Sequence, residues 1–265
     1  MTKKYALITG GSSGMGLEYA RQLAAQGRNL LIVSNVQEQL DQVQPMLQSE
    51  YGVEVIARFQ DLSKAGSADE LFEYCISNGL EIDMLVCNAG MFFFKELLPS
   101  DEARMETMMN LHTLTPAKLC LLFGSEMKKR SCGNIIIMSS MASRIVAPGL
   151  TTYASTKAFL RIFGKSLYYE MRPYGVKVTT VCPGAIATPL YRLKESLMDF
   201  GVKIGVIRTP RWLVRRALRA NRRGRKCISP AFMNIYLPPL IAALPDWAIN
   251  KIWKKVKGKM KEEGV

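Results

Sequence analysis

A tyrosine and a lysine lie four residues apart in T-T-Y-A-S-T-K, as Tyr153 and Lys157, with only small residues between them. On a helix, residues i and i+4 share a face, so the phenol and the ammonium can lie one turn apart. A neighbouring ammonium favours the phenolate and lowers the pKa of a phenol from its usual value of about 10. The pair therefore predicts a general acid toward a carbonyl, or a base toward an alcohol, near neutral pH.

A glycine-rich turn at the start of the chain, T-G-G-S-S-G-M-G, lies between a short apolar run and an amphipathic run. In that position, Gly10, Gly14 and Gly16 let backbone N–H groups and a helix N-terminus approach a dinucleotide pyrophosphate. The spacing departs from G-x-G-x-x-G, and no Gly-Lys-Ser/Thr follows, which excludes a P-loop. We predict a dinucleotide site; a tight turn without a ligand is the alternative.

Short apolar runs alternate with helical patterns along most of the chain. The runs are K-Y-A-L-I-T, N-L-L-I-V-S, V-E-V-I-A-R-F, I-D-M-L-V-C-N, G-N-I-I-I-M-S and V-K-V-T-T-V-C-P. Continuously apolar strands separated by helices are typical of a parallel sheet covered on both faces. We expect a doubly wound α/β (Rossmann) domain over residues 1–190. Residues 191–265 are expected to form a substrate cover and a basic, partly amphipathic helical C-terminal extension of the same domain.

An ordered set of motifs resembles the short-chain dehydrogenase/reductase family, over residues 3 to about 190. Besides the glycine turn and Y-x-x-x-K, they are Asp61 in F-Q-D-L, N-A-G from Asn88, Asn110, Ser140 thirteen residues before Tyr153, and P-G-A-I-A-T from Pro183. The resemblance implies an enzyme that interconverts a ketone and a secondary alcohol with a nicotinamide dinucleotide. It also implies a homodimer or homotetramer.

The resemblance implies a role for each residue of the motifs. Ser140 would donate to the reacting oxygen, and Asn110 would hold a water that resupplies protons through Lys157; Ser139 lacks the family spacing. The implied catalytic residues are Asn110, Ser140, Tyr153 and Lys157. The implied cofactor-binding residues are Gly10, Ser12, Ser13, Gly14, Met15, Gly16, Ser34, Asn35, Asp61, Leu62, Asn88, Ala89, Gly90, Tyr153, Lys157, Pro183, Gly184, Ile186 and Thr188.

The end of the second predicted strand bears on the choice of cofactor, because it reads Ser34-Asn35-Val36. An acidic residue there would accept from the ribose 2′-OH of NAD, and an arginine would pair with the 2′-phosphate of NADP. Neither charge is present. Because no carboxylate repels a phosphate, and Ser12, Ser34 and Asn35 could donate to it, we favour NADP(H) over NAD(H).

Apolar residues follow both N-A-G and P-G, where the family has its substrate pocket. They favour a lipophilic ketone, such as a 3-oxoacyl, 3-keto-sphingoid or steroid compound, over a sugar. The predicted substrate contacts are Ser140, Tyr153, Phe92, Val146 and Tyr191. One alternative is an NAD-dependent hydroxysteroid dehydrogenase. Another is a non-catalytic dinucleotide-binding sensor or scaffold, against which the complete catalytic set argues.

The net charge of +14 is concentrated at one end of the chain. Residues 1–200 hold 20 basic and 19 acidic side chains, whereas residues 201–265 hold 16 and 3. A basic helix and a lysine-faced amphipathic helix flank an apolar segment that four prolines interrupt, which disfavours a straight spanning helix. We predict peripheral contact with an anionic membrane through residues 201–265. The alternative is that the apolar stripe packs on the protein; nucleic acid is not expected.

The cysteines and the single histidine suggest no metal site. The six cysteines are scattered without C-x-x-C, and His112 has no partner at ligand spacing. We therefore expect no disulfide framework and a location in the reducing cytoplasm, with or without membrane attachment. For His112 we expect a packing or surface role. The N-terminal apolar run is too short for a signal peptide and predicts a first strand.

Overall fold

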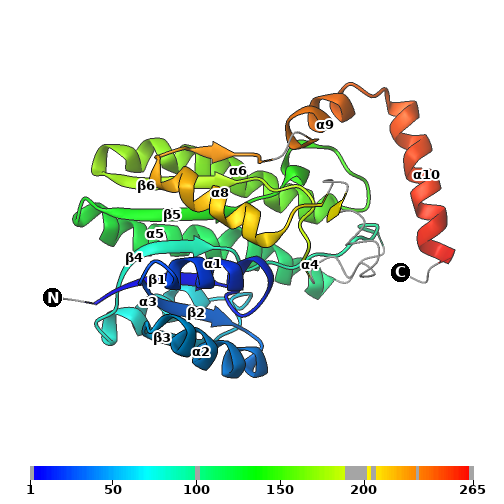
Figure 1. Cartoon of the computed structure of the whole chain (residues 1–265). Helices are drawn as coiled ribbons and strands as arrows, with labels where there is room; N and C mark the ends of the chain where they lie inside the picture. Colours follow the sequence, from blue (N-terminus) through cyan, green and yellow to red (C-terminus); the bar gives the residue numbers. More distant parts are fainter. Residues whose placement is uncertain (1–2, 99–101, 189–201, 204–206, 231–232, 263–265) are drawn as a thin grey trace.

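The computed structural model describes residues 3–98, 102–188, 202–203, 207–230 and 233–262 (Figure 1). Tyr191 and most of the predicted substrate cover lie outside these residues.

A seven-stranded sheet forms the centre of the described fold. Its order is β3-β2-β1-β4-β5-β6-β7, and every neighbouring pair is parallel. The order reverses between β1 and β4, and ligands of such sheets bind beyond the carboxyl ends of the strands at that point. The doubly wound prediction is confirmed. The strands are β1 (Lys4–Thr9), β2 (Asn29–Ser34), β3 (Val55–Phe59), β4 (Glu81–Cys87), β5 (Gly133–Met138), β6 (Val176–Val181) and β7 (Cys227–Ile228).

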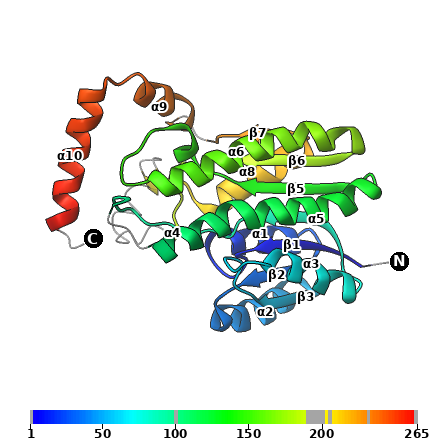
Figure 2. The same cartoon turned by 180° about the vertical axis from the view of Figure 1, so that it is seen from behind.

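Helices cover both faces of the sheet, and each face has its own apolar core. On one face lie α1 (Gly14–Ala24), α2 (Gln37–Tyr51) and α8 (Pro210–Arg222), with α1 and α8 in front in Figure 1. On the other lie α3 (Ser67–Ser77), α5 (Thr115–Lys129) and α6 (Thr151–Met171), seen in Figure 2. The inner strands are buried from both sides, which explains why they read as continuous apolar runs, whereas β3 and β7 at the edges are partly exposed.

The sequence from Met105 to Leu122 predicts one helix, which in the structure is divided by a wide turn. The chain forms α4 (Glu102–Met109), a π-helical turn (Asn110–Leu114) and then α5. The Thr115 N–H donates to the Asn110 carbonyl, five residues back, so one extra residue is accommodated. Within this turn, His112 and Thr113 are buried. Short 3₁₀ turns cover Met141–Arg144 and Arg172–Tyr174.

The C-terminal part begins with α8, whose start and attachment are set by two polar side chains. The Trp212 N–H donates to Thr209 Oγ1, with Pro210 in the first turn as expected. Asn221 Nδ2 donates to the carbonyls of Ile135 and Lys177, which ties α8 to the sheet. Then follow α9 (Met233–Ala242) and α10 (Asp246–Glu262). Among the described residues, no helix has the length and hydropathy to cross a bilayer.

Candidate active site

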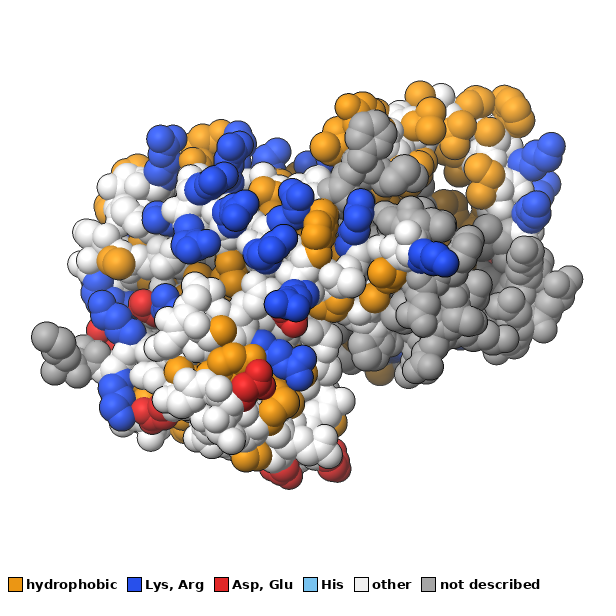
Figure 3. Space-filling model, in the orientation of Figure 1, with side chains coloured by type: hydrophobic (Ala, Val, Ile, Leu, Met, Phe, Trp, Pro, Cys, Tyr) orange, Lys and Arg blue, Asp and Glu red, His pale blue; other side chains and the backbone are white. Residues whose placement is uncertain are grey.

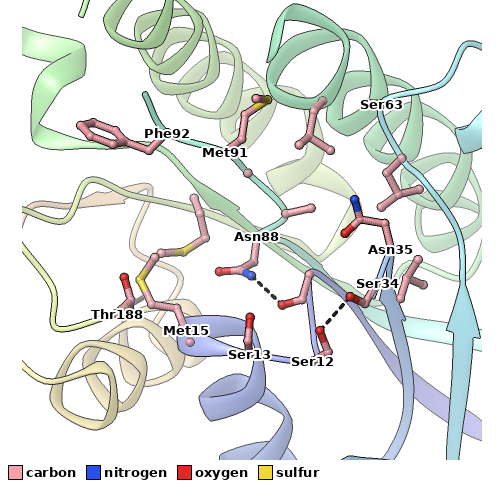
Figure 4. A pocket seen from close by; sticks show the side chains of 18 of the residues that line it. Ser12, Ser13, Met15, Ser34, Asn35, Ser63, Asn88, Met91, Phe92 and Thr188 are labelled. Atoms are coloured by element: carbon pink, nitrogen blue, oxygen red, sulfur yellow. Dashed lines mark hydrogen bonds between the residues drawn. The ribbon is translucent and has the colours of Figure 1, made fainter. Parts of the chain in front are cut away.

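A cavity of about 660 Å³ opens at the carboxyl ends of the strands, at the switch point between β1 and β4. Figure 4 shows its polar side chains converging from the turns after β1, β2 and β4. Most of the predicted site residues line it. They are Gly10, Ser12, Ser13, Gly14, Met15, Ser34, Asn35, Asp61, Leu62, Asn88, Ala89, Gly90, Phe92, Ser140, Tyr153, Lys157, Pro183, Ile186 and Thr188.

The glycine turn forms one wall of the cavity. Gly10 and Gly14 have φ values of +64° and +53°, which L side chains rarely adopt. A Cβ on Gly16 would lie 1.8 Å from the Gly10 carbonyl oxygen, so only glycine lets α1 start this close to the turn. Ser13, the N-cap of α1, makes no side-chain capping bond. The first N–H groups of α1 are thus available to an anion, as a pyrophosphate site requires.

Asn88 holds the glycine turn against the end of β4. Its Nδ2 donates to the Thr9 carbonyl at 3.0 Å and to the Gly10 carbonyl at 3.3 Å. The backbone N–H groups of Asn88 and Ala89 donate to Thr9 Oγ1. Asn88 Oδ1 is buried and makes no hydrogen bond within the described chain. Asn88 therefore shapes the cofactor wall and leaves one acceptor for a ligand.

A small hydroxyl network lies at the end of β2. Ser12 Oγ donates to Ser34 Oγ at 2.7 Å, a bond drawn in Figure 4, and Ser34 Oγ accepts from the Val36 N–H. The third member of the network is Gln39, whose Oε1 lies 2.8 Å from Ser12 Oγ. Asp61 is the one acidic residue among the described lining, and its Oδ1 is occupied by the N–H and hydroxyl of Ser63. Within the described part of the chain, the hydrogen-bond partners of the Ser34 hydroxyl are uncharged.

Tyr153 lies at the other end of the cavity, buried on α6. Its ring makes edge contacts with Phe92 at 5.0 Å and with His112 at 5.9 Å between ring centroids. Burial raises the pKa of the phenol, and a hydrogen bond with Ser140 opposes that rise. Ser140 Oγ accepts from the Ala142 N–H at 3.1 Å, which leaves its own proton for the phenol or a reacting oxygen.

Lys157 lies below Tyr153, with its Nζ 5.8 Å from the centre of the phenol ring. Nζ donates to the Met138 carbonyl at 3.1 Å, and burial lowers the pKa of the amine to about 8. The expected low pKa of Tyr153 is wrong for this structure, because burial raises the pKa of the phenol more than the Ser140 hydrogen bond lowers it. Ser139 is excluded from the catalytic role, since its hydroxyl donates to the Lys157 carbonyl at 2.7 Å.

His112 is a site residue that the sequence motifs do not reveal. Its Nε2 accepts from the Met91 N–H at 2.9 Å, and its Nδ1 lies 3.0 Å from Thr156 Oγ1. Because the Thr156 hydroxyl donates to the Tyr153 carbonyl, we assign the ring proton to Nδ1. Burial and then the charge of Lys157 lower the pKa of His112 well below its usual value, so the ring is neutral. His112 is a packing residue, as expected, and it supports Tyr153.

Four predicted residues do not line the cavity. Asn110 begins the π-turn and is half-buried. Val146 is 76% exposed on a surface turn, so its substrate contact stays a prediction. Gly16 packs against the Gly10 carbonyl behind the cavity wall. Gly184 is the chain neighbour of Pro183, which lines the cavity. Sequence motifs also missed part of the lining. These residues are Val33, Val36, Gln39, Gln60, Ser63, Met91, Arg104, Thr107, Leu111, Met138 and Ser139.

The lining fits a nicotinamide dinucleotide. The glycine turn and the start of α1 suit a pyrophosphate, and Asp61 lies where an adenine would reach. Thr188 Oγ1 is buried with no partner among the described residues, and the Thr188 side chain lies next to Gly14. An unpaired hydroxyl there suits the carboxamide of a nicotinamide, which offers both a donor and an acceptor. Within the described part of the chain, no cluster of His, Cys, Asp and Glu could hold a metal.

Comparisons with known proteins agree with this geometry. A family model described as short chain dehydrogenase matches residues 4–197. The chain is 29% identical to the very-long-chain 3-oxoacyl-CoA reductase of Macaca fascicularis over 94% of this chain and 78% of that protein. It is 31% identical to the protein of that name from Mus musculus, over 74% of this chain and 64% of the other, just under two thirds. An alcohol dehydrogenase structure from Thermococcus sibiricus, complexed with 5-hydroxy-NADP, has a TM-score of 0.73 at 26% identity, covering 86% and 95%.

Proposed function

The chain belongs to the short chain dehydrogenase family, and we propose that it reduces the ketone of a lipophilic substrate with NADPH, with Tyr153 as the proton donor. Membership makes it an NAD(P)-dependent oxidoreductase of CH–OH and C=O groups. The observation that carries the proposal is the meeting of the Ser140 hydroxyl, the Tyr153 phenol and the Lys157 amine at one end of a cavity whose other end is a dinucleotide-type glycine turn.

Each side chain contributes one step to the reduction. The bound nicotinamide cofactor supplies or accepts the hydride. Ser140 donates to the substrate oxygen, because its Oγ accepts from the Ala142 N–H and its own proton stays available. Tyr153, protonated because burial raises its pKa, gives its proton to that oxygen as negative charge develops there. Lys157, next to the phenol, stabilises the phenolate that forms; Asn110 is kept as a proposed proton-relay residue on family resemblance alone.

A lipophilic substrate is supported by the surroundings of Tyr153. Phe92 lies against the phenol, and Met91 and Phe93 pack in the same apolar cluster. The relatives in macaque and mouse are named very-long-chain 3-oxoacyl-CoA reductases. We propose a long-chain 3-oxoacyl thioester first, then a 3-keto-sphingoid base or a steroid ketone. An NAD-dependent hydroxysteroid dehydrogenase remains the second candidate, because the same apolar wall accommodates a steroid.

Cofactor oxidation tests both substrate and cofactor. The purified chain is mixed with 3-oxoacyl thioesters, sphingoid ketones or steroid ketones, with NADPH and NADH in parallel. We expect turnover of a long-chain 3-oxoacyl thioester and a preference for NADPH. Turnover of steroids alone, with NADH, would support the second candidate, and turnover of none would support a dinucleotide-binding sensor.

The preference for NADPH is supported by the hydroxyl network at the end of β2. Ser12 and Ser34 carry no charge and can donate to a 2′-phosphate, and the one carboxylate of the described lining, Asp61, already accepts from the N–H and hydroxyl of Ser63. The Thermococcus structure was solved with an NADP derivative. Isothermal titration with NADP and NAD checks the preference; equal affinity would contradict it.

Contact with an anionic membrane is supported by the face that α8 turns outward. Arg215, Arg219 and Arg222 are exposed, α8 contains no acidic residue, and Figure 3 shows basic side chains crowded over it. Exposed apolar side chains of α9 and α10 include Leu240 at 64% and Trp247 at 69%. Such a combination suits an interfacial site. We place the protein at the cytoplasmic side of a membrane.

Part of the C-terminal extension also packs on the protein. Trp253 of α10 contacts Phe94 with ring centroids 6.4 Å apart, and Lys257 pairs with Glu96 at 2.7 Å. Sedimentation with anionic vesicles at low salt separates the two roles. Arg215→Glu/Arg219→Glu should lose most of the pelleted protein, whereas a matched double reversal on α5, Lys118→Glu/Lys129→Glu, should not. If the α8 variant pelleted with the vesicles to the same extent as the α5 variant, membrane contact through α8 would be contradicted.

A homodimer or homotetramer is supported by the outer side of α5 and α6, shown in Figure 2. Leu121 on α5 and Ile162 on α6 are 67% and 60% exposed, and Phe159 lies on the same helix. Exposed apolar patches of this kind often mark subunit contacts. Light scattering of the parent and of Ile162→Glu checks this: we expect dimers or larger for the parent and a smaller species for the variant. A monomeric parent would contradict it.

A further inference from the structure

Two cysteines meet at the edge of the sheet, behind the wall of the cavity. Cys182 directly follows β6, and Cys227 begins β7, the strand beside β6 in Figure 2. Their sulfur atoms lie 3.9 Å apart. The register pairs Cys227 with Thr180, two residues before Cys182, and alternate residues of a strand point to the same face. The pairing of β6 with β7 therefore brings the two thiols together.

The two sulfur atoms have different surroundings. Cys182 is fully buried, whereas Cys227 is partly exposed. A hydrogen bond from Cys182, followed by the charges of Lys165, Arg161 and Arg144, lowers the pKa of Cys227 to about 7. The same hydrogen bond and burial raise the pKa of Cys182. The two shifts favour Cys227 over Cys182 as the site of the thiolate.

A partly exposed thiolate next to cations is the environment in which cysteines react, and oxidant-sensing cysteines often have a second thiol in reach. Besides the 3.9 Å distance between the sulfur atoms, the cationic side chains that act on Cys227 support its reactivity. Arg161 Nε is buried and makes no hydrogen bond within the described chain, and the charge of Arg161 is among those that lower the pKa of Cys227. The hydride chemistry proposed above uses neither sulfur.

We propose that Cys227 is a site of oxidation by hydroperoxides and that Cys182 resolves the product as a disulfide. The Cys227 thiolate attacks the outer peroxide oxygen: an S–O bond forms, the O–O bond breaks, and an alcohol or water leaves after protonation. Cys182 sulfur then attacks Cys227 sulfur, the S–S bond forms, the S–O bond breaks, and water leaves with the proton of Cys182. Two thiols are oxidised, and one hydroperoxide is reduced by two electrons.

The disulfide would form close to the cofactor wall. Closing the sulfur separation from 3.9 Å to about 2.05 Å draws Cys182 toward β7. The next residue, Pro183, lines the cavity, and its carbonyl accepts from the Met141 N–H at 2.7 Å. We therefore expect oxidation to weaken dinucleotide binding by several-fold.

Peptide mapping of the full chain tests the proposal without reference to its catalytic activity. The protein is treated with hydrogen peroxide, alkylated without reduction and digested. We expect a peptide pair linked through Cys182 and Cys227 to appear first, before oxidation of Cys132, the exposed cysteine that serves as the internal control. Preferential oxidation of Cys132, or oxidation without the Cys182–Cys227 link, would overturn the proposal.

Two variants separate the roles of the sulfur atoms. In Cys182→Ser, dimedone should trap a sulfenic acid at Cys227; in Cys227→Ser, no such adduct should form at Cys182. A Cys132→Ser control should behave as the parent. An adduct on Cys182 in Cys227→Ser would overturn the assignment. If a variant fails to fold, the mapping of the parent protein decides alone.

Discussion

Replacing His112 with glutamine is expected to remove an acid sensitivity of the fold. His112 is the single histidine of the chain, and burial holds its pKa well below the usual 6.5. As the pH falls below about 6.5, the unfolded chain binds a proton at this residue and the folded chain does not. The free energy of unfolding therefore falls by up to about 1.4 kcal/mol per pH unit, until the pH reaches the folded pKa. Above about 6.5 this contribution disappears.

The pH dependence follows from proton binding by the unfolded chain, and the cost of each variant at neutral pH follows from the hydrogen bonds of the ring. Between about pH 7 and about pH 5.5, linkage at one group with an unfolded pKa near 6.5 amounts to about 1.3 kcal/mol. A glutamine oxygen can accept from the Met91 N–H as Nε2 does, so the variant should cost about 1 kcal/mol at neutral pH. His112→Leu leaves that N–H unpaired and should cost about 2–4 kcal/mol.

Urea unfolding, followed by circular dichroism at both pH values, measures the effect. The unfolding free energy of His112→Gln relative to that of the parent should rise by about 1.3 kcal/mol from pH 7 to pH 5.5, so that the variant is no less stable than the parent at the lower pH. Carboxylates and cysteines contribute equally to both proteins and cancel. Equal differences at the two pH values would refute the assignment of a neutral, buried His112.

Three further changes test the cavity. Gly16→Ala should lower the free energy of unfolding in urea by about 1–3 kcal/mol, because its Cβ would meet the Gly10 carbonyl. Gly124→Ala, at a buried helix position where a Cβ would make only ordinary van der Waals contacts, should stabilise by up to about 1 kcal/mol. Ser34→Asp should reverse the ratio of NADPH to NADH turnover by at least about tenfold, since a carboxylate repels the 2′-phosphate; an unchanged ratio would place that phosphate elsewhere. Because burial lowers the pKa of Lys157 to about 8, kcat/KM for ketone reduction should fall above that pH. In Lys157→Arg, whose guanidinium stays charged, this decrease should be absent.

The sheet and most of the cavity lining could be predicted from the sequence because they depend on local patterns. Each buried strand is a continuous apolar run, and the glycine turn precedes an amphipathic helix. The two-residue strand β7 could not be predicted, since its pairing with β6 arises from long-range contact. The π-turn at Asn110 breaks no apolar periodicity, so the sequence favoured one continuous helix.

Side-chain environments were harder to predict than positions. That Val146 points to solvent follows from the turn after Arg144 and not from its residue type. The pKa of Tyr153 depends on how deeply α6 is covered, which spacing alone does not contain. His112 lies beneath Tyr153 only because the π-turn directs it inward. These features all depend on contacts between segments that are distant in the sequence.

The most direct test of the central proposal is the turnover of Tyr153→Phe with a long-chain 3-oxoacyl thioester and NADPH. The phenylalanine ring can keep its packing against Phe92 and His112, so NADPH affinity, followed by fluorescence, should change little. Loss of the phenol proton should reduce kcat/KM by about 10²–10⁴-fold. A variant that reduces the ketone as fast as the parent would contradict the assignment of Tyr153 as proton donor.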